Sequence, residues 1–138
     1  MMNNDESKEA PSNELRCDYL VVGAGAAGMA FVDTLLTEDP TCRVVLVDRR
    51  AKAGGHWVDS YPFVRLHQPS HYYGVNSLPL GKARDAKGRE CFDRDDLASG
   101  SEVVAYYEKV LAQFEASGRV DVRLRDGRVV ELVLRKHI

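Results

Sequence analysis

An α/β fold built around a parallel sheet is predicted by three observations in this 138-residue chain. A short apolar run at residues 19–22 is typical of a buried parallel strand. It leads directly into the glycine-rich turn at residues 23–28, which opens a helical pattern with Ala27, Ala30, Phe31 and Leu35 on one side. A second β-branched run at residues 43–47 then ends in Asp48. Strand, turn, helix and strand follow one another in the order of a β-α-β unit.

The turn Gly23-Ala24-Gly25-Ala26-Ala27-Gly28 has the G-x-G-x-x-G spacing, and each glycine has a physical role. Gly23 allows the tight turn, Gly25 leaves room for a pyrophosphate, and Gly28 lets the helix pack closely. The helix N-terminus, with Ala26 and Ala27, offers unpaired N–H groups and a partial positive charge to phosphates. Asp48 suits a ribose 2′-OH. The complete arrangement predicts a dinucleotide site.

The residues after the second strand bear on which dinucleotide binds. An acid at Asp48 favours a free 2′-OH, as in NAD or the adenosine half of FAD. Arg49 and Arg50 complicate this prediction, because an arginine beside the ribose can accept a 2′-phosphate. The simpler interpretation is that one arginine lies over the adenine and the other is solvated.

The next residues carry a family resemblance. Gly54-Gly55-His56-Trp57 resembles the G-G-x-W of flavin-containing and Baeyer–Villiger monooxygenases, within the two-dinucleotide-binding flavoproteins. Tyr61, Pro62 and Arg65 resemble the Y-P-x-x-R of Baeyer–Villiger enzymes. The match departs at three points: the gap between Trp57 and Tyr61 is one residue shorter than usual, Phe63 replaces the usual Gly, and His67 replaces the usual Asp.

The resemblance implies a Rossmann-like FAD-binding domain with a parallel sheet and a small β-hairpin or meander, apparently truncated because the chain holds one glycine fingerprint. It implies the FAD-binding portion of a flavin-dependent oxidoreductase, of monooxygenase type, with NAD(P)H as the reductant of the full-length enzyme. The alternative is a non-catalytic or incomplete dinucleotide-binding module without its own substrate domain. No catalytic residue is assigned. The expected cofactor-binding residues are Gly23, Gly25, Ala26, Ala27, Gly28, Asp48, Arg49, Gly54, Gly55, His56, Trp57, Arg65 and His67.

Composition narrows the function class. The hydrophobic share is 44%, the charged share 29% and the net charge −2, so no nucleic-acid or membrane attraction is expected.

The polar residues 1–16 predict a disordered tail before a domain at 17–138, in a cytoplasmic protein. Its three cysteines include no C-x-x-C pair. His67 and His71 are a poor metal pair, because Pro69 between them argues against a helix. The substrate is unknown, and the remainder of the enzyme or a second copy is the expected partner.

Residues 53–92 show little periodicity but are rich in aromatic residues. Long ordered loops tend to carry function, so we expect a wall folded over the flavin. The alternative is a satellite hydrophobic cluster. A short strand is expected at residues 63–66. Arg65 is the candidate for a charge-assisted contact with the cofactor, although a surface salt bridge is the competing interpretation.

The last third of the chain predicts packing elements. A helical turn capped by Asp93 is expected at residues 92–97. Ser99 and Glu102 form a capping box before a helix whose apolar residues recur at helical spacing and which Gly118 ends. Residues 120–134 predict a β-hairpin around Asp126-Gly127. The resemblance implies a β-meander or a third strand in this part of the chain.

Overall fold

The computed structural model describes residues 15–82 and 84–125. Its main sheet has three parallel strands in the order β1-β2-β5: β1 is Tyr19–Val22, β2 is Val44–Asp48 and β5 is Val120–Leu124. Tyr19 pairs with Val44, and Val44 pairs with Val120 on its other side. Because β2 is the central strand, all five of its residues are buried. The predicted parallel sheet is confirmed, but β1 lies at its edge, and only Val21 of this strand is buried as expected.

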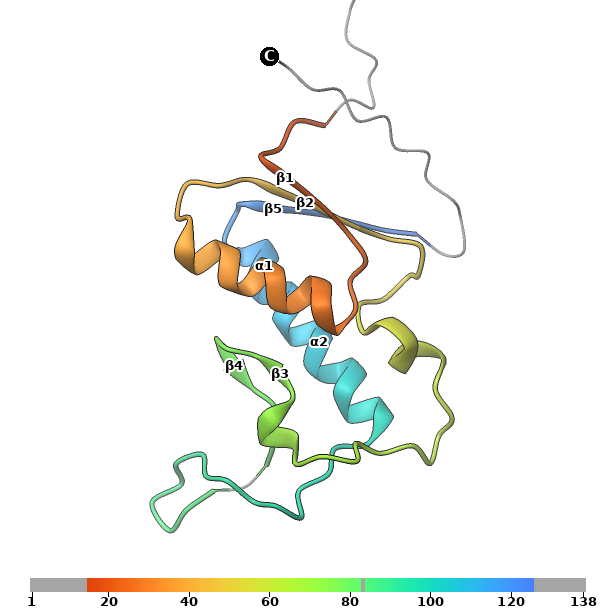
Figure 1. The fold of residues 1–138 in the computed structure, drawn as a ribbon, viewed down its shortest axis with the longest axis vertical. Helices are drawn as coiled ribbons and strands as arrows, with labels where there is room; N and C mark the ends of the chain where they lie inside the picture. Colours follow the sequence, from red (N-terminus) through yellow and green to blue (C-terminus); the bar gives the residue numbers. More distant parts are fainter. Residues whose placement is uncertain (1–14, 83, 126–138) are drawn as a thin grey trace, which may run out of the picture.

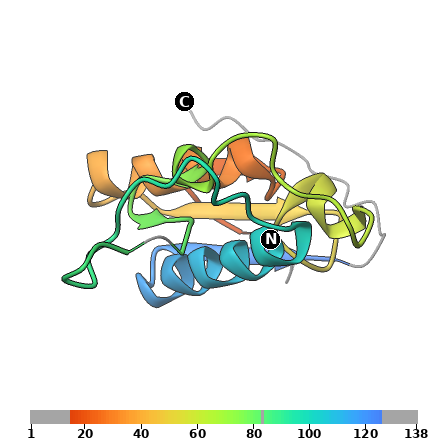
Figure 2. The ribbon, with the colours of Figure 1, turned by 90° about the horizontal axis from the view of Figure 1, so that it is seen from below.

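Two helices cover one face of this sheet (Figures 1 and 2). Helix α1, Ala26–Glu38, connects β1 to β2, and helix α2, Gly100–Ala116, leads into β5. Each connection moves one strand further in the same direction, so right-handed crossovers place both helices on the same side. The core lies between helices and sheet, where Met29, Val32, Val103 and Val110 pack against Leu46. Among the described residues, no helix is long and apolar enough to cross a membrane.

The predicted apolar face of α1 is partly wrong: Ala30 and Leu35 pack against the core as expected, but the other two predicted residues do not. Ala27 and Phe31 are exposed, whereas Met29, Val32 and Asp33 are buried. Apolar residues surround most of this helix, so its sequence pattern does not fix which side faces the sheet. Phe31 instead meets Tyr19 edge to face, with ring centroids 6.4 Å apart, beside the outer edge of β1.

Asp33 of α1 is buried under a small hairpin, and hydrogen bonds to that hairpin satisfy its carboxylate. The hairpin consists of β3, Gly74–Val75, and β4, Leu78–Pro79. Asp33 accepts hydrogen bonds from the backbone N–H of Ser77, at 3.1 Å, and from the Ser77 hydroxyl. Tyr106 of α2 fixes the hairpin from the other side: its hydroxyl accepts from Val75 N–H at 2.8 Å and donates to the Leu78 carbonyl.

The long segment before α2 is ordered by backbone pairing with residues 96–100. Leu66 N–H donates to the Ala98 carbonyl at 2.9 Å, and Gly100 N–H donates to the Val64 carbonyl at 2.8 Å. The strand predicted at 63–66 is reduced to one isolated bridge between Arg65 and Ser99. Two 3-10 helices lie in this segment: η1, Gly55–Asp59, and η2, Ser70–Tyr72.

The predictions for the last third of the chain have mixed outcomes. Ser99 caps α2 by accepting the Glu102 N–H at 3.2 Å, and Gly118 follows its end with φ +71°, as predicted. The helical turn predicted at 92–97 is partly confirmed: Asp93 accepts the Asp95 N–H at 2.8 Å, as expected of a cap, but the segment forms one turn closed by the Asp96 N–H and the Asp93 carbonyl, and no helix. In the predicted hairpin, the first arm is the parallel strand β5, and the turn and second arm lie outside the described residues. Residues 1–14 of the predicted tail also lie outside them.

Arg119 joins the end of α1 to the start of β5. Its guanidinium donates to the carbonyls of Leu36, at 2.6 Å, and Asp39, at 2.9 Å, which are orphan acceptors at the helix C-terminus. We expect Arg119→Leu to lower the free energy of unfolding by about 1–2 kcal/mol, since charged hydrogen bonds contribute at that level. Urea unfolding measures this change. Arg123→Leu, which removes only an exposed pair with Asp121, is the control and should cost less than about 0.5 kcal/mol; equal losses would contradict the capping role.

Candidate functional site: a double glycine turn at the carboxyl edge of the sheet

The first glycine turn joins β1 to α1. Gly23 has φ +107°, which favours glycine, and its N–H donates to the Val47 carbonyl at 2.8 Å. A Cβ on Gly28 would lie 1.9 Å from the Gly23 carbonyl oxygen. The tight turn and the close approach predicted for these glycines are therefore present. The nearest atoms to a Cβ on Gly28 belong to the Gly23 carbonyl group of the turn, and the Val21 side chain of β1 is further away, at 3.6 Å.

The second glycine turn, Gly54-Gly55, packs directly on the first. Gly54 N–H donates to the Ala24 carbonyl at 2.8 Å. A Cβ on Gly25 would lie 3.4 Å from the Gly55 Cα, and a Cβ on Gly55 would lie 3.0 Å from the Gly25 Cα. The two turns thus form one backbone surface, here called the glycine cradle and made of residues 23–28 and 54–55. It lies where β1 and β2 end, at the right of Figure 1.

Asp48 is fixed at the edge of the glycine cradle. Its side chain is buried, and each carboxylate oxygen accepts one backbone N–H at 2.7 Å, from Ala24 and from Arg50. A carboxylate has about four acceptor positions, so both oxygens keep capacity for ribose hydroxyls. The sequence predicted the ribose contact but missed the bond to Ala24, which connects the end of β2 to the first glycine turn.

The two arginines after Asp48 differ in their contacts. Arg49 is exposed. Arg50 Nε donates to Asp59 Oδ2 at 2.8 Å, so η1 is tied back to the end of β2. Sequence reasoning missed Asp59, because the path of η1 decides which cation this residue meets.

Trp57 follows the second glycine turn, and its backbone N–H donates to the Gly54 carbonyl at 3.2 Å. Its indole N–H donates to the Tyr73 hydroxyl at 2.8 Å, and Tyr73 meets Tyr107 at a ring-centroid distance of 6.2 Å. A Cβ on Gly54 would lie 3.9 Å from the Tyr107 ring. Burial raises the pKa of Tyr107, and the hydrogen bond with Tyr73 adds to that rise. Tyr107 is therefore a neutral packing residue.

Comparisons with known proteins agree with this geometry. Residues 21–87 match the model of the NAD(P)-binding Rossmann-like domain. The chain is 26% identical over 113 residues to a probable FAD-binding monooxygenase of Acinetobacter baylyi, covering 81% of this chain and 20% of that protein. Its fold matches an open crystal structure of cyclohexanone monooxygenase with TM-score 0.51 and 25% identity, over 77% of this chain and 20% of that one. Over the part it covers, the chain therefore has a Rossmann-like fold and is similar to flavin monooxygenases.

This Rossmann-like domain has a nearer relative of unknown activity. An uncharacterized protein of Mycobacterium tuberculosis is 51% identical over 127 residues, which cover 87% of this chain and 23% of that protein. The chain thus spans about a quarter of the length of the relatives it matches.

Other predicted site residues of the domain lie apart from the glycine cradle or at its surface. Arg65 is exposed and donates to the Leu97 carbonyl at 3.1 Å, in the pairing with residues 96–100. His67 is exposed. His56 is exposed beside Trp57, with ring centroids 4.9 Å apart. The structure therefore brings His56 and Trp57 to the second glycine turn, and it joins Arg65 to the segment before α2.

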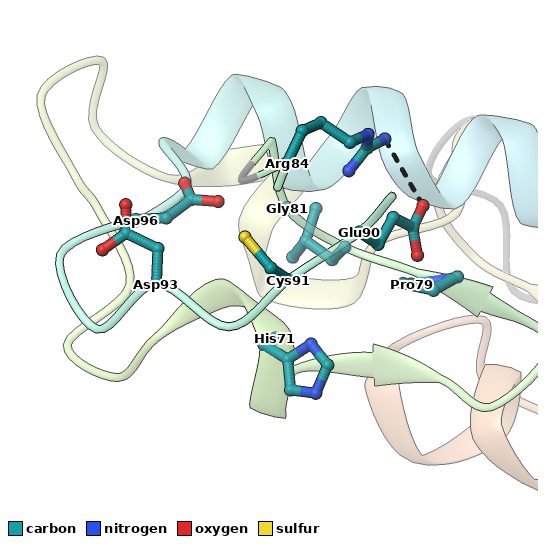
Figure 3. Close-up of a pocket in the computed structure, with 9 residues that line it drawn as sticks. His71, Pro79, Gly81, Arg84, Glu90, Cys91, Asp93 and Asp96 are labelled. Carbon is teal, nitrogen blue, oxygen red and sulfur yellow. Dashed lines mark ion pairs between the residues drawn. The ribbon is translucent and has the colours of Figure 1, made fainter. Parts of the chain in front are cut away.

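A separate small pocket lies beside η2 and β4 (Figure 3). It is lined by His71, Pro79, Leu80, Gly81, Arg84, Glu90, Cys91, Asp93 and Asp96. Its volume of about 10 Å³ is close to that of a single water probe, far too small for a nucleotide. Arg84 and Glu90 form an ion pair at 3.4 Å in its wall. Within residues 15–82 and 84–125, no three His, Cys, Asp or Glu residues are grouped to hold a metal ion.

Proposed function

We propose that the chain binds FAD in the glycine cradle, as the FAD-binding portion of a flavin-dependent, NAD(P)H-using oxidoreductase of monooxygenase type. The observation that carries this proposal is the contact between Gly25 and Gly55, which merges two glycine turns into one surface. A nucleotide-binding fold that contacts phosphates through a single glycine turn does not require a second glycine pair packed against that turn. The relationship to a probable FAD-binding monooxygenase supports the same cofactor.

The residues present fit the adenosine diphosphate part of FAD. The cofactor pyrophosphate would lie against Gly25, the N-cap of α1, where a side chain is absent. The first turn of α1 has no acidic residue, so the partial positive charge of the helix N-terminus is not offset. The ribose would lie at Asp48, whose carboxylate is already oriented by two backbone N–H groups. The second turn, with Gly55 and Trp57, would face the riboflavin part.

The protein contributes positioning to this chemistry. A bound flavin supplies hydride acceptance from NAD(P)H and, once reduced, the activation of oxygen. The glycine cradle would hold the pyrophosphate by backbone N–H groups, and Trp57, tied to Tyr73, would shield one side of the site from water. The substrate-binding groups belong to the rest of the proposed enzyme.

A binding module without its own substrate domain is the second candidate. Both candidates bind FAD, but they differ in turnover. NAD(P)H consumption by the FAD-loaded chain would identify an enzyme, whereas FAD binding without consumption would identify a module.

The absorbance spectrum of the desalted protein, with and without added FAD, tests the proposal. We expect flavin absorbance to stay with the wild-type chain and to be lost in Gly25→Val, whose side chain would press on the Gly55 backbone and force the two turns of the glycine cradle apart. Ala105→Val, which adds similar bulk to the exposed side of α2, should retain FAD. Circular dichroism confirms that each variant is folded. A wild-type chain that retains no flavin would contradict the proposed function.

A further inference from the structure

Four charged residues lie at or after the end of β2, where the adenosine ribose is expected. Asp48 and Arg49 are consecutive at the end of β2, Arg50 follows, and Asp59 comes from η1. Two are anionic and two cationic, so their formal charges cancel. The net effect on a ligand therefore depends on which of them are bound to each other.

Arg50 is already bound within the protein. Its Nε donates to Asp59 Oδ2 at 2.8 Å, and its side chain is only 24% exposed. The backbone N–H of the same residue donates to Asp48 Oδ1. Arg50 is thus held at both its backbone and its side chain, with its charge offset by Asp59.

An arginine at this place in a dinucleotide fold is the group that accepts a 2′-phosphate. Here a 2′-phosphate would approach the fixed carboxylate of Asp48 without a free Arg50 to offset the repulsion. Asp59 takes the Nε of Arg50 and offsets its charge, so a 2′-phosphate could reach only the remaining guanidinium N–H groups, on an arginine whose attraction for an anion is weakened. A free 2′-OH is not repelled by Asp48 and does not need Arg50, because it can donate a hydrogen bond to the Asp48 carboxylate.

We propose that Asp59 is a specificity-determining residue that keeps 2′-phosphorylated dinucleotides out of the glycine cradle by holding Arg50. This inference rests on the proposed function, since it takes the cradle as the adenosine site of FAD. Its consequence is a separation of cofactors: a 2′-phosphorylated nicotinamide nucleotide, present as a reductant, does not compete for the FAD position. Specificity of this kind comes from rejecting the wrong ligand as much as from binding the right one.

Calorimetric titration with NAD⁺ and NADP⁺ tests the proposal, because this pair of ligands differs only in the 2′-phosphate. The wild-type chain should favour NAD⁺. Asp59→Asn should shift the NADP⁺/NAD⁺ affinity ratio toward NADP⁺ by about two- to fivefold, the size expected for releasing an exposed ion pair whose Asp59 side chain is 69% exposed. Asp59→Glu, which keeps the charge, should preserve most of the wild-type ratio. The double variant Arg50→Leu/Asp59→Asn should lose the gain.

Asp85→Asn is the matched control, since it makes the same change in net charge at the remote pair of Asp85 with Arg89. It should leave the ratio unchanged. FAD retention, measured on every variant, separates the two proposals. If the wild type and Asp59→Asn both bind FAD but share one NADP⁺/NAD⁺ ratio, only the role of Asp59 is overturned. An equal gain in Asp85→Asn would overturn it too, and a wild type that binds no FAD would overturn both proposals.

Discussion

Gly28→Ala is expected to lower the free energy of unfolding by about 3 kcal/mol or more, at the upper end of the cost of overpacking. The added Cβ would lie 1.9 Å from the Gly23 carbonyl oxygen. That oxygen belongs to the backbone of a turn anchored to Val47, so it has no rotamer through which to escape. With a total stability of about 5–15 kcal/mol typical of domains, such a loss would leave a marginal fold. Urea unfolding followed by circular dichroism measures it.

Gly88→Ala is the informative control for that variant. Gly88 has φ +75° but no atom within 4 Å of its would-be Cβ, so alanine meets backbone strain without a clash. The expected cost is about 1 kcal/mol. A Gly28→Ala variant no less stable than Gly88→Ala would mean that the first glycine turn can move apart, and would contradict the close approach described above.

Tyr107→Ala is expected to cost about 3–5 kcal/mol, as for other large buried aromatic side chains. Tyr107 is 1% exposed and packs against Tyr73, Tyr106 and the Gly54 turn. Because it lies under the second glycine turn, variants that stay folded should also bind FAD more weakly. Thermal unfolding gives the stability change, and FAD titration gives the change in affinity.

Two further tyrosine variants separate packing from hydrogen bonding. Tyr107→Phe removes only the hydroxyl bonded to Tyr73 and should cost about 1 kcal/mol. Tyr72→Ala removes a side chain that is 69% exposed and should change the stability little. If Tyr72→Ala and Tyr107→Ala were equally destabilising, the proposed support of the glycine turn by α2 would be wrong.

The parts of the fold that the sequence predicts well are those with local signals. The β1-α1-β2 unit depends on one glycine turn and two apolar runs, and α2 on a cap at Ser99 and a glycine at 118. The orientation of α1 has no such signal, because Phe31 and Met29 are both apolar and only tertiary packing chooses between them. The strand β5 was expected in a hairpin, because its pattern of alternation cannot say whether its partner is adjacent or on the far side of a crossover.

The candidate site divides in the same way. The glycines and Asp48 are separated by fixed spacings within one β-α-β unit, so their meeting could be predicted. The pair of Arg50 with Asp59 depends on how the chain turns after Gly55, and the hold of Asp33 on Ser77 depends on a hairpin of two-residue strands. Such strands are too short to leave a periodic pattern. The cofactor-binding roles of Arg65 and His67 stay predictions.

The strand order β1-β2-β5 also has a consequence for the time course of folding. The pairing of β1 with β2 is available early, since only α1 separates them, but β2 meets β5 only after the whole intervening segment and α2 have been made. Closing so long a connection costs conformational entropy, and the local contacts formed earlier do not offset this loss. During synthesis on a ribosome, Val44–Asp48 would therefore keep one edge of unpaired backbone N–H and C=O groups until Val120–Leu124 emerges. This interval is when the nascent chain is most exposed to misassociation.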